Sequence, residues 1–171
     1  MSEKERKISI GGIKFSEELV QVSLLKAGES KSSFGDLLQL LSEKKINITF
    51  LCHSAGSLHS KSSFCVGCID FATVQEILDF PSLASLDIEV IRSVGTITLF
   101  PHRNSLHLLG LILNVFGKFD FPVYSLSTSI SAIAVNTAYS DLARIADKLQ
   151  DVVFLPDNHA PFRKEFRLKE I

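Results

Sequence analysis

Residues 34–52 read FGDLLQLLSEKKINITFLC, and this stretch contains a helix followed by a strand. In its first part, apolar residues fall at positions 34, 37, 38 and 41, the spacing of one face of an amphipathic helix. In its last part, apolar residues at positions 46, 48, 50 and 52 alternate with the polar residues Asn47, Thr49 and His53, although position 51 is leucine. That period of two predicts a half-buried strand.

The stretch lies inside a longer pattern. Ahead of it, apolar and polar residues alternate over 20–24, and an extended segment at 8–10 is turned by Gly11-Gly12. After it come a long hairpin loop, a return strand at 64–69, a short helix at 73–78 and a strand at 86–90. The order is therefore strand, helix, two hairpin strands, helix and strand over about residues 8–90.

The same order follows a second time. Residues 96–100 predict a strand, 106–116 a helix, 123–128 and 130–135 a hairpin, 142–149 a helix and 152–155 a last strand. We therefore predict an α+β fold of two ferredoxin-like βαββαβ domains, each an antiparallel sheet with both helices on one face. The expected domains are residues 8–92 and 93–155, with 156–171 as a C-terminal tail.

The predicted helix at 106–116 is apolar on almost every side. A helix of this kind must be buried on more than its own sheet, so its second face is expected to meet helices of the first domain or of a partner subunit. This pattern predicts a homodimer.

Composition limits the class of protein. The chain has 171 residues, 46% of them hydrophobic, and a net charge of −1, which is typical of a globular protein with a sizeable core. With 18 basic and 19 acidic residues there is no field to attract nucleic acid, and the longest apolar stretch is shorter than the roughly 20 residues needed to cross a membrane. The charged start does not resemble a signal peptide, and three cysteines cannot all pair, so we expect a cytoplasmic protein with reduced thiols.

Two short stretches resemble a known family. Residues 11–25, GGIKFSEELVQVSLL, leading to Ile46-Asn47-Ile48, resemble the first ACT domain of the regulatory part of aspartate kinase. Residues 126–129, LSTS, followed by Ile133-Ala134-Val135, are similar to the second ACT domain of that family. The resemblance implies tandem ACT domains that form a non-catalytic regulatory module, without a cofactor, controlling a metabolic enzyme. It also implies that a small amino acid such as lysine or threonine binds at an ACT–ACT interface.

The predicted order of strands and helices indicates where this ligand would bind. The first two strands of each domain run parallel, so their ends meet the start of the first helix at one edge, where free backbone N–H groups favour a carboxylate. In the first domain we expect the backbone amides of residues 32–34 to bind the carboxylate and Glu29 to bind the amine. The expected ligand-binding residues there are Glu29, Ser32, Ser33, Phe34, His53 and Ser54. The equivalent edge of the second domain offers His102, Arg103, Asn104, Ser105, Ser127 and Ser129.

Two other interpretations stay open. The chain could be a protein–protein scaffold that kept the fold and has no ligand. In the family that it resembles, a glycine in the turn before the first helix lets a ligand approach closely, and the turns at residues 29–32 and 101–105 lack it. Cys65-Val66-Gly67-Cys68 could serve a zinc- or thiol-dependent activity, but residues i and i+3 of a regular strand face opposite sides, and no second such pair is present. Buried structural thiols are the simpler interpretation, so we expect no metal site. The chain also lacks the nucleophile-elbow and phosphate-loop motifs.

Overall fold

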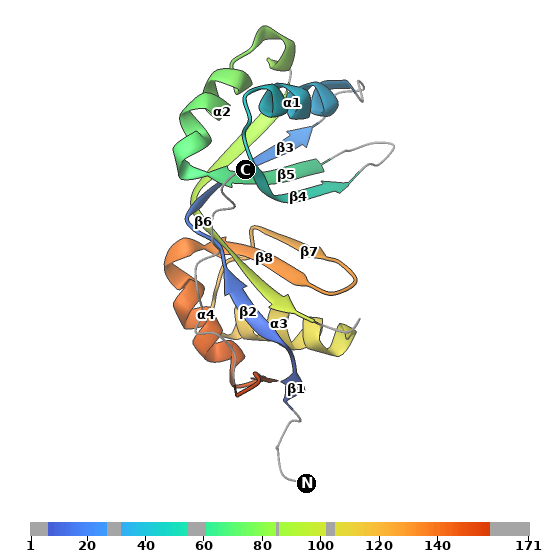
Figure 1. Cartoon of the computed structure of the whole chain (residues 1–171), viewed down its shortest axis with the longest axis vertical. Helices are drawn as coiled ribbons and strands as arrows, with labels where there is room; N and C mark the ends of the chain where they lie inside the picture. The colour runs from blue at the N-terminus through green and yellow to red at the C-terminus, as the bar shows by residue number, and fades with distance from the viewer. Residues whose placement is uncertain (1–6, 27–31, 55–60, 85, 102–104, 158–171) are drawn as a thin grey trace. The chain divides into compact units, whose positions relative to one another are not determined.

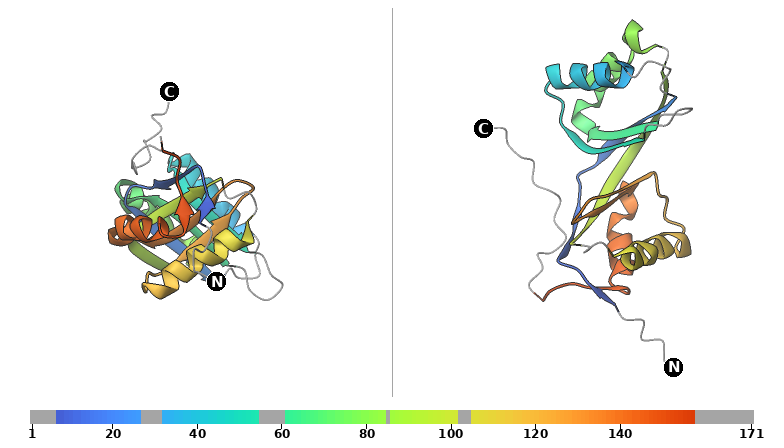
Figure 2. Two further views of the ribbon diagram at one scale, coloured as in Figure 1. Left: turned by 90° about the horizontal axis from the view of Figure 1, so that it is seen from below. Right: turned by 90° about the vertical axis from the view of Figure 1, so that its right-hand side faces the viewer.

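The computed structural model describes residues 7–26, 32–54, 61–84, 86–101 and 105–157. The chain divides into two compact units. Unit 2 is continuous and comprises residues 18–94, whereas unit 1 combines residues 1–17 with residues 95–171. Figures 1 and 2 follow the chain through both units.

Unit 2 has the predicted order of elements. These are β3 (Leu19–Lys26), α1 (Ser32–Glu43), β4 (Ile48–Ser54), β5 (Lys61–Gly67), α2 (Phe71–Leu78) and the first part of β6 (Asp87–Phe100), with short 3-10 helices at Cys68–Asp70 and Pro81–Leu83. The strands are arranged β4-β5-β3-β6, and all three neighbouring pairs are antiparallel. The predicted βαββαβ topology is confirmed for this unit.

One core holds unit 2 together. Alternate residues of β3 and β5 point toward α1 and α2, and the buried side chains come from Val20, Val22, Leu24, Leu37, Leu41, Phe64, Val66, Val74, Ile77 and Leu83. Because residues of one parity on the strands meet both helices, the helices cover the same face of the sheet. This arrangement agrees with the prediction, made from the order of the elements, that both helices lie on one face of the sheet.

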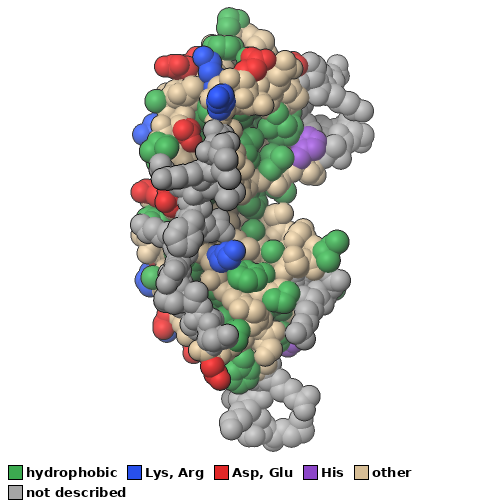
Figure 3. Space-filling model, viewed as in Figure 1, with side chains coloured by type: hydrophobic (Ala, Val, Ile, Leu, Met, Phe, Trp, Pro, Cys, Tyr) green, Lys and Arg blue, Asp and Glu red, His purple; other side chains and the backbone are tan. Residues whose placement is uncertain are grey.

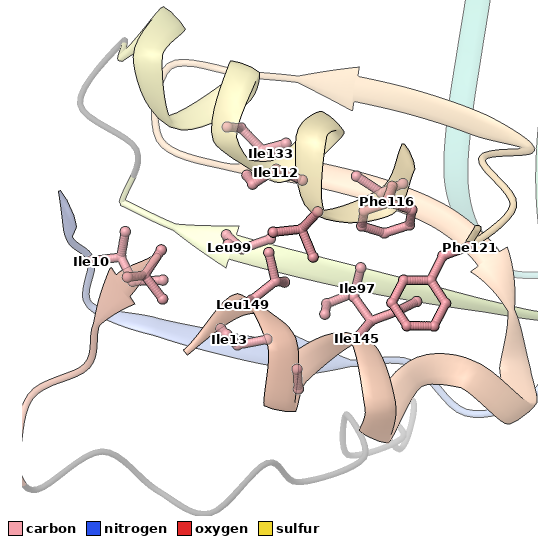
Figure 4. Close-up of a cluster of buried hydrophobic side chains, with 14 of the residues drawn as sticks. Ile10, Ile13, Ile97, Leu99, Ile112, Phe116, Phe121, Ile133, Ile145 and Leu149 are labelled. Carbon is pink, nitrogen blue, oxygen red and sulfur yellow. The ribbon is translucent and has the colours of Figure 1, made fainter. Parts of the chain in front are cut away.

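Unit 1 contains the last part of β6, α3 (Leu106–Lys118), β7 (Ser125–Thr128), β8 (Ile133–Ala138), a 3-10 helix (Tyr139–Asp141) and α4 (Leu142–Leu149). Its sheet is completed by β2 (Gly12–Phe15), and the order is β2-β6-β8-β7. A separate parallel pair joins β1 (Ile8–Ser9) to β9 (Val153–Phe154). Figure 4 shows its core, in which Ile97 and Leu99 of β6 meet Ile112 and Phe116 of α3 and Ile145 and Leu149 of α4.

The N-terminal strands differ from the expected domain boundaries. The sequence analysis placed residues 8–17 in the first domain, but the structure places them in unit 1, where Ile10 and Ile13 are buried. β2 pairs antiparallel with β6, from Gly12 opposite Phe100 to Phe15 opposite Ile97. It therefore occupies the sheet position that the last strand, at 152–155, was expected to fill. Unit 1 is a circular permutation of unit 2.

The ends of the helices confirm the repeat. After α1, Lys45 has φ 56°, Ile46 N–H donates to Leu41 O and Lys45 N–H donates to Ser42 O, which is a Schellman cap. After α3, Asp120 also has φ 56°, and Phe121 N–H donates to Phe116 O. A 3-10 turn likewise precedes both α2 and α4. These features align the two units residue by residue.

Helix α3 is less buried than its composition predicts. Leu108, Ile112, Val115 and Phe116 face the core, but Leu106 is 82% exposed and Leu113 is 43% exposed. Unit 1 by itself thus buries one face of α3, and burial of the second face against the other unit or a partner subunit stays a prediction.

Thr137 gives a first testable prediction. It lies on β8 with the core residues Ile133 and Val135, is fully buried, and its hydroxyl has no hydrogen-bond partner among the described residues. The equivalent position in unit 2, just before the 3-10 turn, is Val66. We expect Thr137→Val to stabilise unit 1 by about 1 kcal/mol, because it removes an unsatisfied buried hydroxyl without changing the side-chain shape. Urea unfolding measures the change. Val66→Thr, the reverse substitution, should destabilise unit 2, and a loss of stability in Thr137→Val would contradict the argument.

Candidate functional site

The edge predicted from connectivity exists in unit 2. Strands β3 and β4 are both antiparallel to β5, so they run parallel to each other, and α1 follows β3. Phe34, in the first turn of α1, stacks on His53, near the end of β4, with ring centroids 5.1 Å apart and an angle of 6° between the planes. The structure thus brings together two of the residues that the sequence analysis selected.

A β-bulge places His53 on this face. Ile48 pairs with Val66, but the register shifts before Phe50 pairs with Cys65. Beyond the shift, Leu51 lies opposite Phe64 and His53 lies opposite Ser62. Since paired residues share a face, His53 points to the side that carries the helices. Simple alternation from Ile46 placed it on the other side.

The imidazole is fixed by a buried hydroxyl. His53 Nδ1 lies 2.7 Å from Ser62 Oγ, and Ser62 is 1% exposed whereas His53 is exposed. When the Ser62 hydroxyl donates to Nδ1, Nε2 carries the ring proton and can donate to an acceptor outside the protein. Figure 3 shows one face of the molecule with histidine side chains in purple and hydrophobic side chains in green.

Ser62 lies outside the predicted site, because the serine- and glycine-rich composition of residues 54–63 predicts a loop. The structure begins β5 at Lys61, and Ser54 pairs with Lys61 at the end of the hairpin strands. The signal that could have found Ser62 is its even spacing with Phe64 and Val66, both core residues.

Several predicted ligand residues lie outside the described part of the chain. These are Glu29, the side chains of Ser32 and Ser33, and His102, Arg103 and Asn104. Their proposed roles remain predictions. The C-terminal tail lies outside it too, beyond residue 157.

At the equivalent edge of unit 1, the serines serve the backbone. Ser105 Oγ caps α3 by accepting from Leu108 N–H at 3.1 Å. Ser129 Oγ accepts from Ala132 N–H at 3.1 Å in the turn after β7. Ser127 is half-buried on β7, opposite Ala134. Ser105 and Ser129 thus each bond within their own turn.

The repeat shows how the two edges differ. Thr128 lies opposite Ile133 at the place where His53 lies opposite Ser62. Leu109 stands as far ahead of Asp120 as Phe34 stands ahead of Lys45. Unit 1 therefore has leucine, threonine and isoleucine at the places where unit 2 has the stacked phenylalanine, the histidine and the serine that bonds to it.

The cysteines do not form a cluster. Cys65 is buried in β5, with its thiol 4.0 Å from Gln21 Oε1, whereas Cys68 is exposed in the 3-10 turn. Among the described residues, no group of three or more histidine, cysteine, aspartate or glutamate side chains could hold a metal ion.

Cys68 gives a second testable prediction. Partial burial, together with the negative charge of Glu18, raises the pKa of the Cys68 thiol above its usual value of 9.0. The reactive thiolate is therefore scarcer at pH 8 than for a free cysteine, and its fraction grows as pH rises toward that pKa. We expect Glu18→Gln to lower the pKa and to speed alkylation of Cys68 by iodoacetamide, measured by peptide mass spectrometry. Glu76→Gln, on the exposed side of α2, should leave the rate unchanged, and an unchanged rate in Glu18→Gln would contradict the electrostatic part of this argument.

In the part of the chain that the structure describes, no helix has both the length and the apolar character needed to span a membrane.

Comparison with known structures first defines the class of fold. The chain shares the fold of regulatory subunits and regulatory domains of aspartate kinase, so the resemblance of residues 11–25 and 126–129 is confirmed at the level of the fold. The sequence itself matches no protein-family model and no curated protein.

Particular structures make the likeness concrete. The ligand-free regulatory subunit of aspartate kinase from Thermus thermophilus superposes with a TM-score of 0.74 at 13% identity, over 85% of this chain and 99% of that one. Aspartate kinase from Clostridium acetobutylicum gives 0.72 at 12% identity, over 88% of this chain and 37% of that one. E. coli aspartokinase III in complex with lysine and aspartate gives 0.63 at 12% identity, over 89% and 35%.

Proposed function

We propose that this chain is a non-catalytic regulatory module that binds a small amino acid at the edge of unit 2 and thereby controls an enzyme partner. The observation that carries the proposal is the contact between Phe34 and His53, which joins the start of α1 to the end of β4. The fold supports it, because the chain covers 99% of a structure described as a regulatory subunit of aspartate kinase.

The edge of unit 2 offers complementary groups for an amino acid. Backbone N–H groups at the start of α1 have no partners within the helix and suit a carboxylate. The exposed His53 ring can donate a further hydrogen bond from Nε2 when its Nδ1 accepts from Ser62. Glu29, just before α1 in the sequence, is proposed to hold the ammonium group.

The proposal favours unit 2 over unit 1. In unit 1 the hydroxyls of Ser105 and Ser129 already accept backbone hydrogen bonds, and Thr128 replaces the imidazole. The ligand roles predicted for Ser105, Ser127 and Ser129 are therefore not part of the proposed site.

Regulation would work by differential binding. An effector shifts an equilibrium between two assemblies only by the difference in its affinity for them. We propose that the edge of unit 2 faces a second copy of the chain, so that the effector binds at an ACT–ACT interface and favours one packing of the homodimer. The exposed Leu106 and Leu113 of α3 offer a further apolar surface for a subunit or for the enzyme.

A ligand screen tests the proposal. We expect at least one of the twenty amino acids to raise the melting temperature of the chain, since a ligand at about 100 times its Kd stabilises the folded state by roughly 2.7 kcal/mol. His53→Ala should abolish the shift, whereas Thr128→Ala, at the equivalent place in unit 1, should keep it. No shift with any amino acid would refute effector binding and favour the ligand-free scaffold.

A further inference from the structure

We propose that the effector has an apolar side chain, of the leucine, valine or phenylalanine kind, which packs on Leu38 and Leu51 next to the Phe34–His53 stack. The inference rests on the proposed effector site and specifies the ligand that this site accepts.

Strand β4 presents an unusual apolar side chain beside the imidazole. Leu51 and His53 are two residues apart beyond the bulge, so both point to the face that carries the helices. Leu51 lies opposite the fully buried Phe64, yet is itself 45% exposed because β4 is the edge strand of the sheet. The exposed part of Leu51 therefore lies next to the proposed site.

Helix α1 places a second leucine on the same strip. Phe34 and Leu38 are four residues apart and lie one turn apart on the same side of the helix. Phe34 stacks on His53, and the chain runs down α1 before it returns along β4. Leu38 follows Phe34 along α1, which leads away from the stack, and Leu51 precedes His53 along β4, which leads toward it. Both leucines therefore lie on the same side of the stack. Both α1 side chains are only partly buried against the core of unit 2.

The charges of this strip select against a basic side chain. β4 carries no charged residue from Ile48 to Ser54, and the described residues of the strip, Phe34, Leu38, Leu51, His53 and Ser62, include no carboxylate. The acids of α1 are Asp36 and Glu43, both exposed, and Glu43 accepts a hydrogen bond from Gln39. A lysine side chain on the strip would lose hydration without gaining a counter-ion from these described residues, whereas an apolar one would lose only unfavourable contact with water.

Unit 1 supplies matched controls. Leu126, opposite Val135, corresponds to Leu51, and Leu113 corresponds to Leu38. The apolar pair is thus present on both units, but only unit 2 adds the imidazole bonded to a buried serine. Leu51→Ser and Leu126→Ser make the same chemical change at equivalent places, one inside and one outside the proposed site.

Calorimetric titration of the full chain tests the inference. Leucine, valine, phenylalanine, threonine and lysine are titrated into the unmodified chain and into both variants, and the association state is measured by light scattering. We expect an apolar amino acid to bind at least tenfold more tightly than lysine, Leu51→Ser to weaken its binding about tenfold or more, and Leu126→Ser to leave it unchanged.

The other outcomes are distinct. Tighter binding of lysine, lost in His53→Ala, overturns the inference and leaves the proposed function standing. Absence of binding by every amino acid overturns both. An apolar ligand whose affinity is unaffected by Leu51→Ser also overturns the inference, and if that variant instead changes the association state, the strip is a subunit contact.

Discussion

Replacing Ile13 by aspartate is expected to unfold unit 1 while unit 2 keeps its structure. Ile13 is 6% exposed, lies opposite Leu99 in the β2–β6 pair and belongs to the core that includes Ile97, Ile112 and Leu149. A carboxylate there must be buried without a partner or be protonated, so we expect a loss of more than about 4 kcal/mol. This is the strongest test that the N-terminal strand belongs to unit 1.

Hydrogen exchange measures where the structure is lost. In Ile13→Asp, amides of α3, β8 and α4 should exchange rapidly, whereas those of β3, β5 and α2 should stay protected. Lys14→Asp is the control, since Lys14 is the next residue on the same strand but is exposed. Loss of protection in unit 2 with unit 1 intact would support the domain boundary at residues 8–92 expected from sequence.

Replacing Phe64 by alanine is expected to destabilise unit 2 by about 3–5 kcal/mol. Phe64 is fully buried and lies on β5 between Val22 of β3 and Leu51 of β4. Its removal leaves a cavity below the edge strand that carries His53. We therefore expect loss of effector binding together with the loss of stability.

Urea unfolding together with hydrogen exchange distinguishes the loss of unit 2 in Phe64→Ala from the loss of unit 1 in Ile13→Asp. In Phe64→Ala the protection should fall in residues 19–26, 48–54 and 61–67 and remain in α3 and α4. Phe64→Leu retains most of the buried volume and should cost less than about 1.5 kcal/mol. A cost below about 1 kcal/mol for the alanine variant would show that this core is packed differently.

Local periodicity was sufficient to predict most elements. The alternation over residues 20–24 and the helical spacing at positions 34, 37, 38 and 41 correspond to β3 and α1. The order of elements then predicted that β3 and β4 run parallel and that the start of α1 meets the end of β4, where Phe34 stacks on His53. These features depend on residues close together in sequence or on one connection between neighbouring elements.

Partners far apart in sequence could not be predicted in the same way. The alternation around Ile13 predicts a strand, but it is equally compatible with either sheet, so residues 8–17 were placed in the first domain. The bulge near Phe50 is one residue long and leaves no mark on the pattern, although it reverses the face of every later residue of β4. Ser105 and Ser129 have the residue type of a binding site, and only the coordinates show that the backbone already uses them.

The circular permutation has a consequence for biosynthesis. β2 leaves the ribosome early, but its partner segment, residues 97–100, is made only after all of unit 2 up to Val94. Unit 2 has its whole sheet in one continuous stretch and can fold as soon as it emerges, whereas β2 must wait, unpaired, for β6. We therefore expect unit 2 to fold first during translation and unit 1 to close only when β6 pairs with β2.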